Sequence, residues 1–453
     1  MNRILLRNGK VIHPDRVADE DILIIGERIS RLGPNLPADE STIVLDCRDR
    51  LIFPGLIDAH THMGVPIKDG FSLDDFLTGS RAALHGGVTT IIDFTVLNDD
   101  QTLHESVLDR HANAREALTD YALHCNITRF DEQLISELPD LISQGILSYK
   151  VFTTYEEAGM YLTYEQIRSI AQVLADEGGL LMVHAEDNDV LRNAARPLFS
   201  KRTAEPIYHA LSRPDEAEVR AIEQLGRIAD EIRCPIYIVH LSSARGLECA
   251  RRFEGLLVET CPQYLLLDEE VYHREDGRMF VTSPPLRKIE DLNALWQGLE
   301  TGAVRTIGTD HCPFMLADKQ QNIPFQDIPN GMGGVETMFP VLLSQFLERG
   351  LDLSLLVRLL GSNPAEIFGL APGKGSLAEA SDADLVVVDP TSSSRDWLPD
   401  LVSIADWNAY AGFSAIFPEH VFRRGEWVVK NGQLQPSRPG KFIPGKAPNL
   451  WPR

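Results

Sequence analysis

Two histidines, His60 and His62, end the apolar stretch LIFPGLI, within the run DAHTH at 58–62. Because side chains alternate along a strand, the two imidazoles are expected to point the same way from one strand end. Imidazole is the commonest metal ligand among protein side chains. An isolated His-x-His pair fits a polar strand end equally well, so the metal hypothesis depends on matching groups elsewhere in the chain.

Matching groups occur near the ends of other apolar runs. Lys150 lies in SYKVF, His184 in MVHAED, His240 in IVHLSS and Asp310 in GTDHCPF. Each alone has an ordinary explanation as a polar strand end or a turn cap. In barrels of alternating strands and helices, however, functional groups gather at the carboxyl ends of the strands. We therefore expect four histidines, one lysine and one aspartate on a single rim.

The residue types indicate the chemistry of that rim. Neutral histidines and one carboxylate suit zinc or a similar divalent ion. Two ions need more negative charge, ideally on a group that bridges them. Lys150 has no free lone pair as an ammonium, but its carbamate, formed with carbon dioxide, is a bidentate anion. The residues leave open whether Lys150 carries this modification.

The elements that position these groups follow a regular alternation. Helical patterns separate the apolar runs, for example at 163–179, which ends on glycine, and at 214–233, which begins with proline and acidic residues. The runs are mostly apolar on both faces, as buried parallel strands are. The eight runs are 56–60, 88–93, 121–127, 146–151, 181–184, 235–240, 256–260 and 304–309. The alternation predicts an α/β fold, a (β/α)₈ TIM-like barrel.

Both chain ends read as short β-strands. We predict a barrel over 53–372 and a small β-sandwich domain built from 1–52 and 373–453. The Asn8-Gly9 step and the second Asn-Gly step, in GEWVVKNGQL at 425–434, both predict hairpins. The proline-rich tail after Gln433 is expected either to extend over a neighbouring subunit or to be disordered.

Composition narrows the class of protein. The 453 residues carry 43 basic and 66 acidic side chains, a formal net charge of −23, which argues against nucleic acid or an anionic membrane as partner. No apolar stretch reaches the roughly 20 residues of a membrane helix, and no signal peptide is visible. The six cysteines form no C-x-x-C pair. A reducing, cytoplasmic setting is the simplest expectation.

The motifs together resemble the dihydropyrimidinase/hydantoinase branch of the cyclic amidohydrolases. They are DAHTHM, SYKVF, HAED, VHLSS, ETCPQYLLL, TSPPLR, GTDHCPF and IPNGMGGVET, from about residue 50 to 370. The resemblance implies two Zn²⁺ per chain. His60, His62 and Asp310 would hold one ion, His184 and His240 the other, and N6-carboxylated Lys150 would bridge them. It also implies a homotetramer, since relatives form tetramers.

The same resemblance implies roles in catalysis. Asp310 would move a proton, and Tyr155, five residues after Lys150, would donate to the oxyanion. Ser283 and Asn330 match positions that bind the imide edge of a substrate, largely through backbone groups. His311 and Cys312 adjoin Asp310 and are expected to support the site rather than react.

The predicted substrate is a small cyclic amide, opened to an N-carbamoyl amino acid. Dihydroorotases share a His-x-His-x-Arg motif after the first strand, in which the arginine pairs with the substrate carboxylate. This chain reads His62-Met63-Gly64-Val65 there, without that arginine. Allantoinases fit less well, which leaves 5,6-dihydropyrimidines and 5-substituted hydantoins. Met63, Val65, Phe152 and the loop to Tyr164 are expected to shape the pocket for the ring substituent.

A binding scaffold is the alternative from another functional class. The collapsin response mediator proteins resemble this family, but their metal ligands are incomplete. This chain keeps all six ligand positions, which favours an enzyme.

Overall fold

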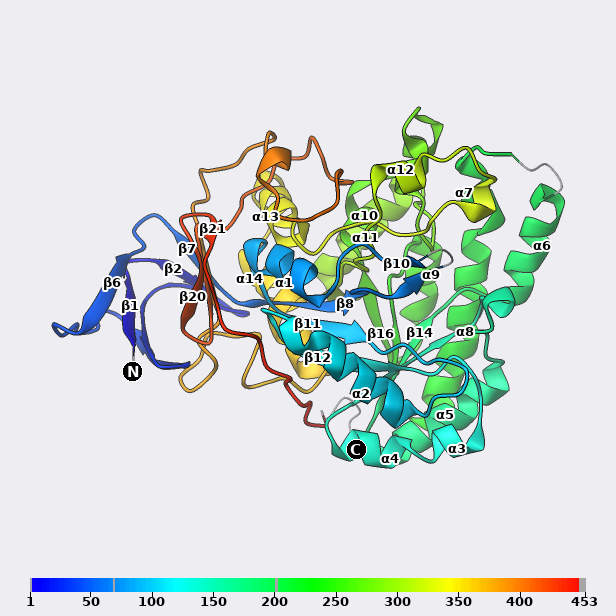
Figure 1. Cartoon of the computed structure of the whole chain (residues 1–453), viewed down its shortest axis with the longest axis horizontal. Coiled ribbons are helices and arrows are strands. Elements are labelled where there is room, and N and C mark those ends of the chain that lie inside the picture. The colour runs from blue at the N-terminus through cyan, green and yellow to red at the C-terminus, as the bar shows by residue number, and fades with distance from the viewer. Residues whose placement is uncertain (1, 68–69, 200–202, 448–453) are drawn as a thin grey trace.

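A computed structural model describes residues 2–67, 70–199 and 203–447. A barrel of strands surrounded by helices forms the larger part, and a β-rich part built from both ends of the chain lies beside it (Figure 1). The separate β domain predicted for the two chain ends is thereby confirmed.

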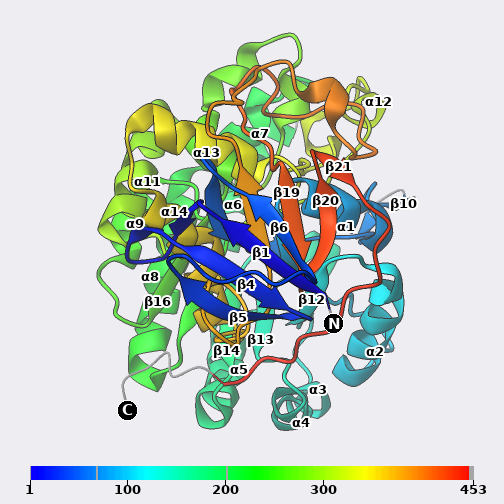
Figure 2. The same ribbon diagram turned by 90° about the vertical axis from the view of Figure 1, so that its left-hand side faces the viewer.

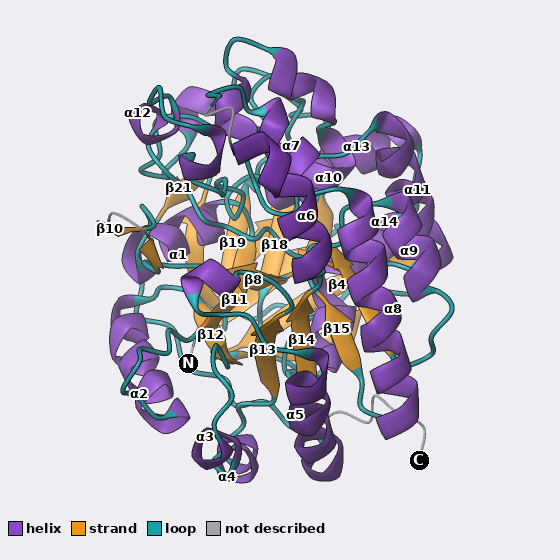
Figure 3. Cartoon of the chain, turned by 90° about the vertical axis from the view of Figure 1, so that its right-hand side faces the viewer, coloured by secondary structure: helices purple, strands orange, loops and turns teal. Residues whose placement is uncertain are grey.

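The barrel strands lie near the eight predicted runs and are all parallel. Each pairs with its neighbours in sequence, in the order β17-β16-β15-β14-β13-β12-β11-β8. The strands occupy the centre and helices enclose them (Figure 3). Their bounds are β8 Leu56–Thr61, β11 Val88–Phe94, β12 Asp120–Asn126, β13 Ser148–Phe152, β14 Leu180–His184, β15 Ile236–Ile238, β16 Leu256–Thr260 and β17 Thr306–Ile307. This confirms the (β/α)₈ class.

The first and last strands close the barrel through the segment after β17. The His62 amide donates to the His311 carbonyl at 3.0 Å. Asp58, buried on β8, accepts from the Thr309 amide at 3.0 Å and from its hydroxyl at 2.6 Å. These bonds bring the His60–His62 pair beside Asp310, about 250 residues later in the chain.

Helices form where the patterns predicted them. α5, Tyr164–Glu177, begins at the Thr163 capping box and ends at Gly178, whose φ of 78° is the left-handed conformation that glycine adopts without strain. α8, Asp215–Ile232, follows Pro214 and carries three acidic residues in its first turn. None of the described helices is long and apolar enough to span a bilayer.

The remaining helices connect and cover the barrel. The α-helices are α1 Phe76–His85, α2 Leu103–Asn113, α3 Glu132–Ile135, α4 Leu138–Ser143, α6 Asn188–Phe199, α7 Ile207–Ser212, α9 Ala244–Ala250, α10 Pro262–Leu266, α11 Ile289–Thr301, α12 Leu316–Lys319, α13 Met338–Arg349, α14 Leu353–Val357 and α15 Asn363–Ile367. Short 3₁₀ or π turns are η1 Ala114–Glu116, η2 Glu156–Ala158, η3 Glu269–His273, η4 Gly277–Phe280, η5 Phe325–Asp327, η6 Arg358–Ser362 and η7 Leu398–Asp400. A two-stranded ribbon, β9 Pro66–Ile67 and β10 Gly70–Phe71, follows β8.

The β-rich part consists of two sheets (Figure 2). One has the order β5-β4-β1-β6 and the other β21-β20-β19-β18-β7-β2-β3. Apolar side chains from both sheets, such as Ile22 and Val387, share one buried cluster, as in a sandwich. The bounds are β1 Arg3–Arg7, β2 Lys10–Ile12, β3 Val17–Asp19, β4 Asp21–Ile25, β5 Arg28–Gly33, β6 Thr42–Asp46, β7 Leu51–Pro54, β18 Leu385–Val388, β19 His420–Arg423, β20 Glu426–Lys430 and β21 Gln433–Leu434.

The two chain ends meet inside the second sheet, where β7 pairs antiparallel with β18. The division into 1–52, 53–372 and 373–453 stays a prediction, and β7 spans the first of these boundaries.

The two Asn-Gly steps behave differently. Asn431 and Gly432 both have positive φ, 51° and 71°, and join β20 to β21 in the predicted hairpin. The hairpin predicted at Asn8-Gly9 is wrong, because β1 and β2 belong to different sheets. Asn8 has a φ of 66°, but Gly9 is not among the positive-φ residues, so the paired conformation of a two-residue hairpin is not formed. The step instead carries the chain from one sheet to the other.

The described part of the C-terminal tail lies along its own barrel, and the predicted contact with a neighbouring subunit stays a prediction. The Tyr121 amide donates to the Lys441 carbonyl at 2.9 Å, and the Ile443 amide donates back to Tyr121 at 2.8 Å. Phe442 packs its ring 4.5 Å from His111, centroid to centroid. The tail thus pairs with the first residues of β12, and this pairing stabilises the extended conformation of the tail within the chain. Residues 448–453 lie outside the described residues.

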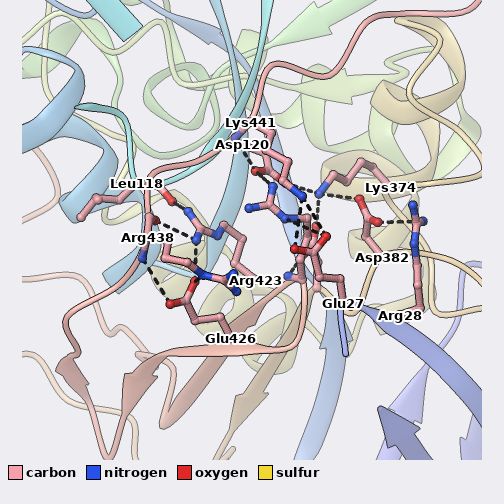
Figure 4. Close-up of polar contacts among 12 residues, drawn as sticks. Glu27, Arg28, Leu118, Asp120, Lys374, Asp382, Arg423, Glu426, Arg438 and Lys441 are labelled. Atoms are coloured by element: carbon pink, nitrogen blue, oxygen red, sulfur yellow. Dashed lines mark hydrogen bonds and ion pairs between the residues drawn. The ribbon is translucent and has the colours of Figure 1, made fainter. Parts of the chain in front are cut away.

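A buried ion cluster joins barrel, sandwich and tail at the amino end of β12 (Figure 4). Lys374 Nζ lies 2.5 Å from Asp120, 2.9 Å from Asp382 and 2.6 Å from Asp384. Arg424 also pairs with Asp120. Three carboxylates and two cations offset one another's charge in a place that excludes water, which makes the burial of this many charges possible.

Candidate active site and metal centre

A cavity of about 460 Å³ opens at the carboxyl ends of the barrel strands. All nine predicted site residues line it, although they come from seven separate segments of the chain. They are His60, His62, Lys150, Tyr155, His184, His240, Ser283, Asp310 and Asn330. The structure therefore assembles the predicted residues in one place, as the barrel rule requires.

His60, His62 and Asp310 converge on one point. The Nε2 atoms of His60 and His62 lie 3.2 and 3.0 Å from Asp310 Oδ1. His62 forms a hydrogen bond there, whereas buried His60 Nε2 has no hydrogen-bond partner among the residues that the structure describes. One atom from each side chain lies within 4.8 Å of the others, a spacing that could hold a metal ion. A buried imidazole nitrogen that faces a carboxylate offers ligand atoms that a divalent cation could bind.

The other histidines continue this group. The ring centroids of His60 and His240 are 5.5 Å apart, and those of His240 and His184 are 4.5 Å apart. Burial lowers the pKa of His62, His184 and His240, which favours the neutral imidazoles that bind metals. Four imidazoles therefore lie close together along the rim, and burial favours the neutral form of three of them.

Two buried glutamates hold these histidines, and sequence reasoning missed both. Glu259, at the end of β16, contacts His60 Nδ1 at 2.7 Å and accepts from the His240 amide at 3.0 Å. Glu186 contacts His184 Nε2 at 2.7 Å. Carboxylates of this kind set the tautomer and ring orientation of metal-binding histidines. Glu259 could have been found as the polar residue at the end of the seventh predicted strand.

Lys150 lies on β13 beside the aromatic floor of the cavity. The residue is 2% exposed to solvent, and its Nζ is 4.9 Å from the centroid of the Phe94 ring. The Phe94 ring is also 4.9 Å from the rings of His60 and His62. Burial lowers the pKa of Lys150 to about 8, against the attraction of Asp310. The neutral amine, which is the form that adds carbon dioxide, is therefore accessible near neutral pH.

Three site residues adopt the left-handed backbone conformation. The φ angles are 66° for Tyr155, 39° for His240 and 53° for Asp310. Each conformation costs on the order of 1–3 kcal/mol in a residue other than glycine, and such strain clusters at functional sites. The surrounding barrel sustains it here, and it directs these three side chains toward the cavity.

Tyr155 is held by a charged neighbour. The Arg213 guanidinium carbon lies 5.3 Å from the Tyr155 ring centroid, and Arg213 also pairs with Glu186. Burial raises the pKa of Tyr155 to about 12, although Arg213 opposes the shift. The phenol therefore stays protonated at neutral pH and can donate a hydrogen bond.

Ser283 and Asn330 lie on two loop segments that are tied together. The Gly331 amide donates to the Val281 carbonyl at 3.1 Å. The Ser283 hydroxyl lies 3.4 Å from His209 Nε2, and both Ser283 and Asn330 line the cavity. These segments form the wall of the cavity beside the histidines.

His311 and Cys312 directly follow Asp310, and their predicted supporting role stays a prediction. His311 Nε2 lies 3.1 Å from Asp74, and its Nδ1 accepts from the Gly334 amide at 3.0 Å, which anchors the loop after Asn330. Burial raises the pKa of Cys312 to about 12, so this thiol is a poor nucleophile.

The predicted substituent pocket is partly corrected. Val65 and Phe152 line the cavity, as do Ala158, Gly159 and Met160 from the loop before Tyr164. Met63 does not: its side chain is fully buried in the hydrophobic core, and its backbone carbonyl accepts from Arg110. Strand alternation explains this, because Met63 follows His62 and points to the opposite side.

Sequence reasoning missed the residues after the second and third barrel strands. These lining residues are Val96, Leu97, Asp99, Asn126 and Thr128. The carboxyl ends of barrel strands face the site, and this rule, which indicated the candidate metal ligands, also applies to β11 and β12 and would have indicated these residues.

Comparisons with known proteins agree with this architecture. The amidohydrolase family model matches residues 51–428. D-phenylhydantoinase of Escherichia coli O1:K1 / APEC is 36% identical over 464 aligned positions, covering 98% of this chain and 99% of the relative. The dihydropyrimidinase structure from Brevibacillus agri NCHU1002 superposes with a TM-score of 0.94 at 32% identity. The D-hydantoinase structure from Thermus sp. gives 0.94 at 30% identity, and each alignment covers 98% of this chain and 99% of the other.

A parallel eight-stranded barrel with a histidine-rich rim and a flanking β-sandwich defines a barrel hydrolase of the metal-dependent type. The chain belongs to the amidohydrolase family, in its dihydropyrimidinase/hydantoinase branch. The resemblance drawn from the motifs is confirmed, and with it the prediction of a cyclic amidohydrolase rather than a scaffold.

Proposed function

We propose that this protein opens 5,6-dihydropyrimidines or 5-monosubstituted hydantoins to N-carbamoyl amino acids. The observation that carries the proposal is the cavity at which six potential metal ligands, a protonated tyrosine and two loop segments meet. The relatives named dihydropyrimidinase, D-hydantoinase and D-phenylhydantoinase support the same substrate class.

The proposed cofactor is a pair of Zn²⁺ ions. His60, His62 and Asp310 would hold one, His184 and His240 the other, and carboxylated Lys150 would bridge both. The unpartnered His60 nitrogen, the neutral imidazoles and the accessible amine of Lys150 support this assignment. When bound, the ions would supply hydroxide near neutral pH and polarise the ring carbonyl.

The side chains complete the chemistry. Ser283 and Asn330 would orient the imide edge of the ring through their backbone groups. Tyr155 would donate its phenol hydrogen to the carbonyl oxygen as negative charge develops there. Asp310 would accept a proton from the attacking water and pass it to the leaving ring nitrogen. Burial disfavours ionised Asp310, but His60 and His62 outweigh it and lower the Asp310 pKa to about 2, so the carboxylate is ready to accept.

We expect dihydrouracil, dihydrothymine or a 5-monosubstituted hydantoin to be opened, and dihydroorotate to be a poor substrate. None of the described residues that line the cavity is an arginine. A ring carboxylate would therefore lack the charged partner that the arginine of the dihydroorotase motif provides. Desolvating an unpaired charge costs several kcal/mol. The measurement is kcat/KM across this panel with zinc-loaded protein. If dihydroorotate gave the highest value, the proposed substrate class would be wrong.

Tyr155→Phe is expected to reduce kcat by roughly 10²-fold, with a smaller change in KM, because one oxyanion donor is lost. Steady-state kinetics on the best substrate of the panel provide the measurement. Phe152→Leu is a suitable comparison, since Phe152 lines the same cavity and carries no donor. A rise in KM alone for Tyr155→Phe would instead make Tyr155 a ground-state binding residue.

Two further sequence predictions stay predictions. They are the cytoplasmic location and the homotetramer. Sedimentation or light scattering of the purified protein measures the second of them directly.

A further inference from the structure

A buried lysine that the proposed mechanism does not use lies behind the two substrate segments. Lys319 is the last residue of α12 and is fully buried. Its Nζ donates to the Val281 carbonyl at 2.9 Å and to the Gly331 carbonyl at 2.5 Å. Val281 lies two residues before Ser283, and Gly331 directly follows Asn330.

Two aromatic rings lie close to the amine of this lysine. The Lys319 Nζ atom is 5.6 Å from the Phe314 ring centroid and 5.7 Å from that of Trp407. Within the described part of the chain no carboxylate lies within ion-pair distance of it. Burial lowers the pKa of Lys319 to about 7. A buried lysine without a carboxylate is costly, so its two carbonyl contacts require an explanation.

The geometry of the two segments provides one. The Gly331 amide already donates to the Val281 carbonyl, and Lys319 binds that same carbonyl together with the carbonyl of Gly331. Lys319 thus joins the two segments from the side opposite the cavity. Two carbonyls turned toward Lys319 cannot turn into the cavity, where they would compete for the N–H groups of an imide.

We propose that Lys319 is a positioning residue for substrate, which holds the Val281–Ser283 and Asn330–Gly331 segments at the spacing that the imide edge of the ring requires. It touches neither the metal ligands nor the reacting atoms, so its loss affects binding of the ring more than the chemical step. This inference rests on the proposed function for its substrate, but the spacing of the two segments is a property of the chain itself.

Lys319→Met keeps the length of the side chain and removes both hydrogen bonds, and Lys319→Gln keeps a donor that can reach one carbonyl. We expect Lys319→Met to raise KM by at least about tenfold, the scale of a small misplacement of substrate. The kcat value should stay within about threefold of the parent, the pattern of lost ground-state binding. The KM of Lys319→Gln should lie between those of the parent and Lys319→Met. This second variant also provides the result if Lys319→Met does not fold.

Lys374→Met is the matched control. Lys374 is a similarly buried lysine in the ion cluster at the amino end of β12 (Figure 4). It is not among the described residues that line the cavity. Its replacement should lower the melting temperature without changing the ratio of KM to kcat.

Amide hydrogen exchange gives a readout that does not depend on activity. Exchange at 281–283 and 330–332 should speed up in the Lys319 variants and remain unchanged in Lys374→Met. Unchanged exchange in a folded Lys319 variant overturns the proposal, and so does an unchanged KM in an active one. Failure of the parent protein to open any ring of the panel would count against the proposed function alone, since the exchange experiment still decides whether Lys319 holds the segments.

Discussion

Lys150→Ala is expected to lose most of the bound metal and to reduce ring opening to the background of the assay. The side chain is buried among the four imidazoles and Asp310, where the proposed carbamate would supply the negative charge shared by two ions. Without it, the Asp310 carboxylate would be the one negative charge in this ligand set to offset the four positive charges of two divalent ions. Metal analysis of the purified variant, together with kcat on the best substrate, provides the measurement.

A small carboxylic acid offers a sharper test of the bridging role. Because alanine leaves space where the lysine side chain lay, added acetate or propionate should restore part of the metal content and activity of Lys150→Ala. Lys374→Met serves again as the control for loss of a buried lysine, and it should keep its metal. A Lys150→Ala protein with full metal and full turnover would disprove the proposed bridge.

Asp310→Asn is expected to keep some metal but to lose turnover by about 10²–10⁴-fold, the range of general acid–base catalysis. An amide can still contact the imidazoles of His60 and His62 through its oxygen, but it cannot accept and return a proton. Single-turnover and steady-state rates on metal-loaded protein separate the loss of chemistry from the loss of metal.

Asp99→Asn is the comparison for this variant. Asp99 is an exposed carboxylate that lines the same cavity and is not part of the cluster with the histidines, so its removal should leave turnover nearly unchanged. If Asp310→Asn turned over at the parent rate with its metal in place, another group would have to carry the proton.

The positions of the proposed metal ligands followed from local sequence. Strand periodicity placed His60 and His62 on one side, and apolar runs ending in polar residues predicted where Lys150, His184 and His240 would lie. These signals are local because alternation along a strand depends only on neighbouring residues. The barrel then follows from the repeated alternation of strand and helix, since parallel strands need long crossover connections.

Contacts between distant segments depended on the tertiary structure. Glu259 and His60 are 199 residues apart, and nothing in their local sequences predicts that one orients the other. The Asn8-Gly9 step has the composition of a hairpin, yet packing assigned its flanking strands to different sheets. The tail after Gln433 has no periodic pattern, and its place beside Tyr121 was decided by an available strand edge.

The sequence by itself therefore determined the family, the barrel and the set of residues that meet at its rim. Only the tertiary structure decided that Met63 points into the core, that His60 Nε2 lies buried beside Asp310, and that Lys319 joins two loops behind the cavity. The physical reason is that residue type and spacing govern local conformation, whereas hydrogen bonds and burial between distant segments are selected by how whole elements pack.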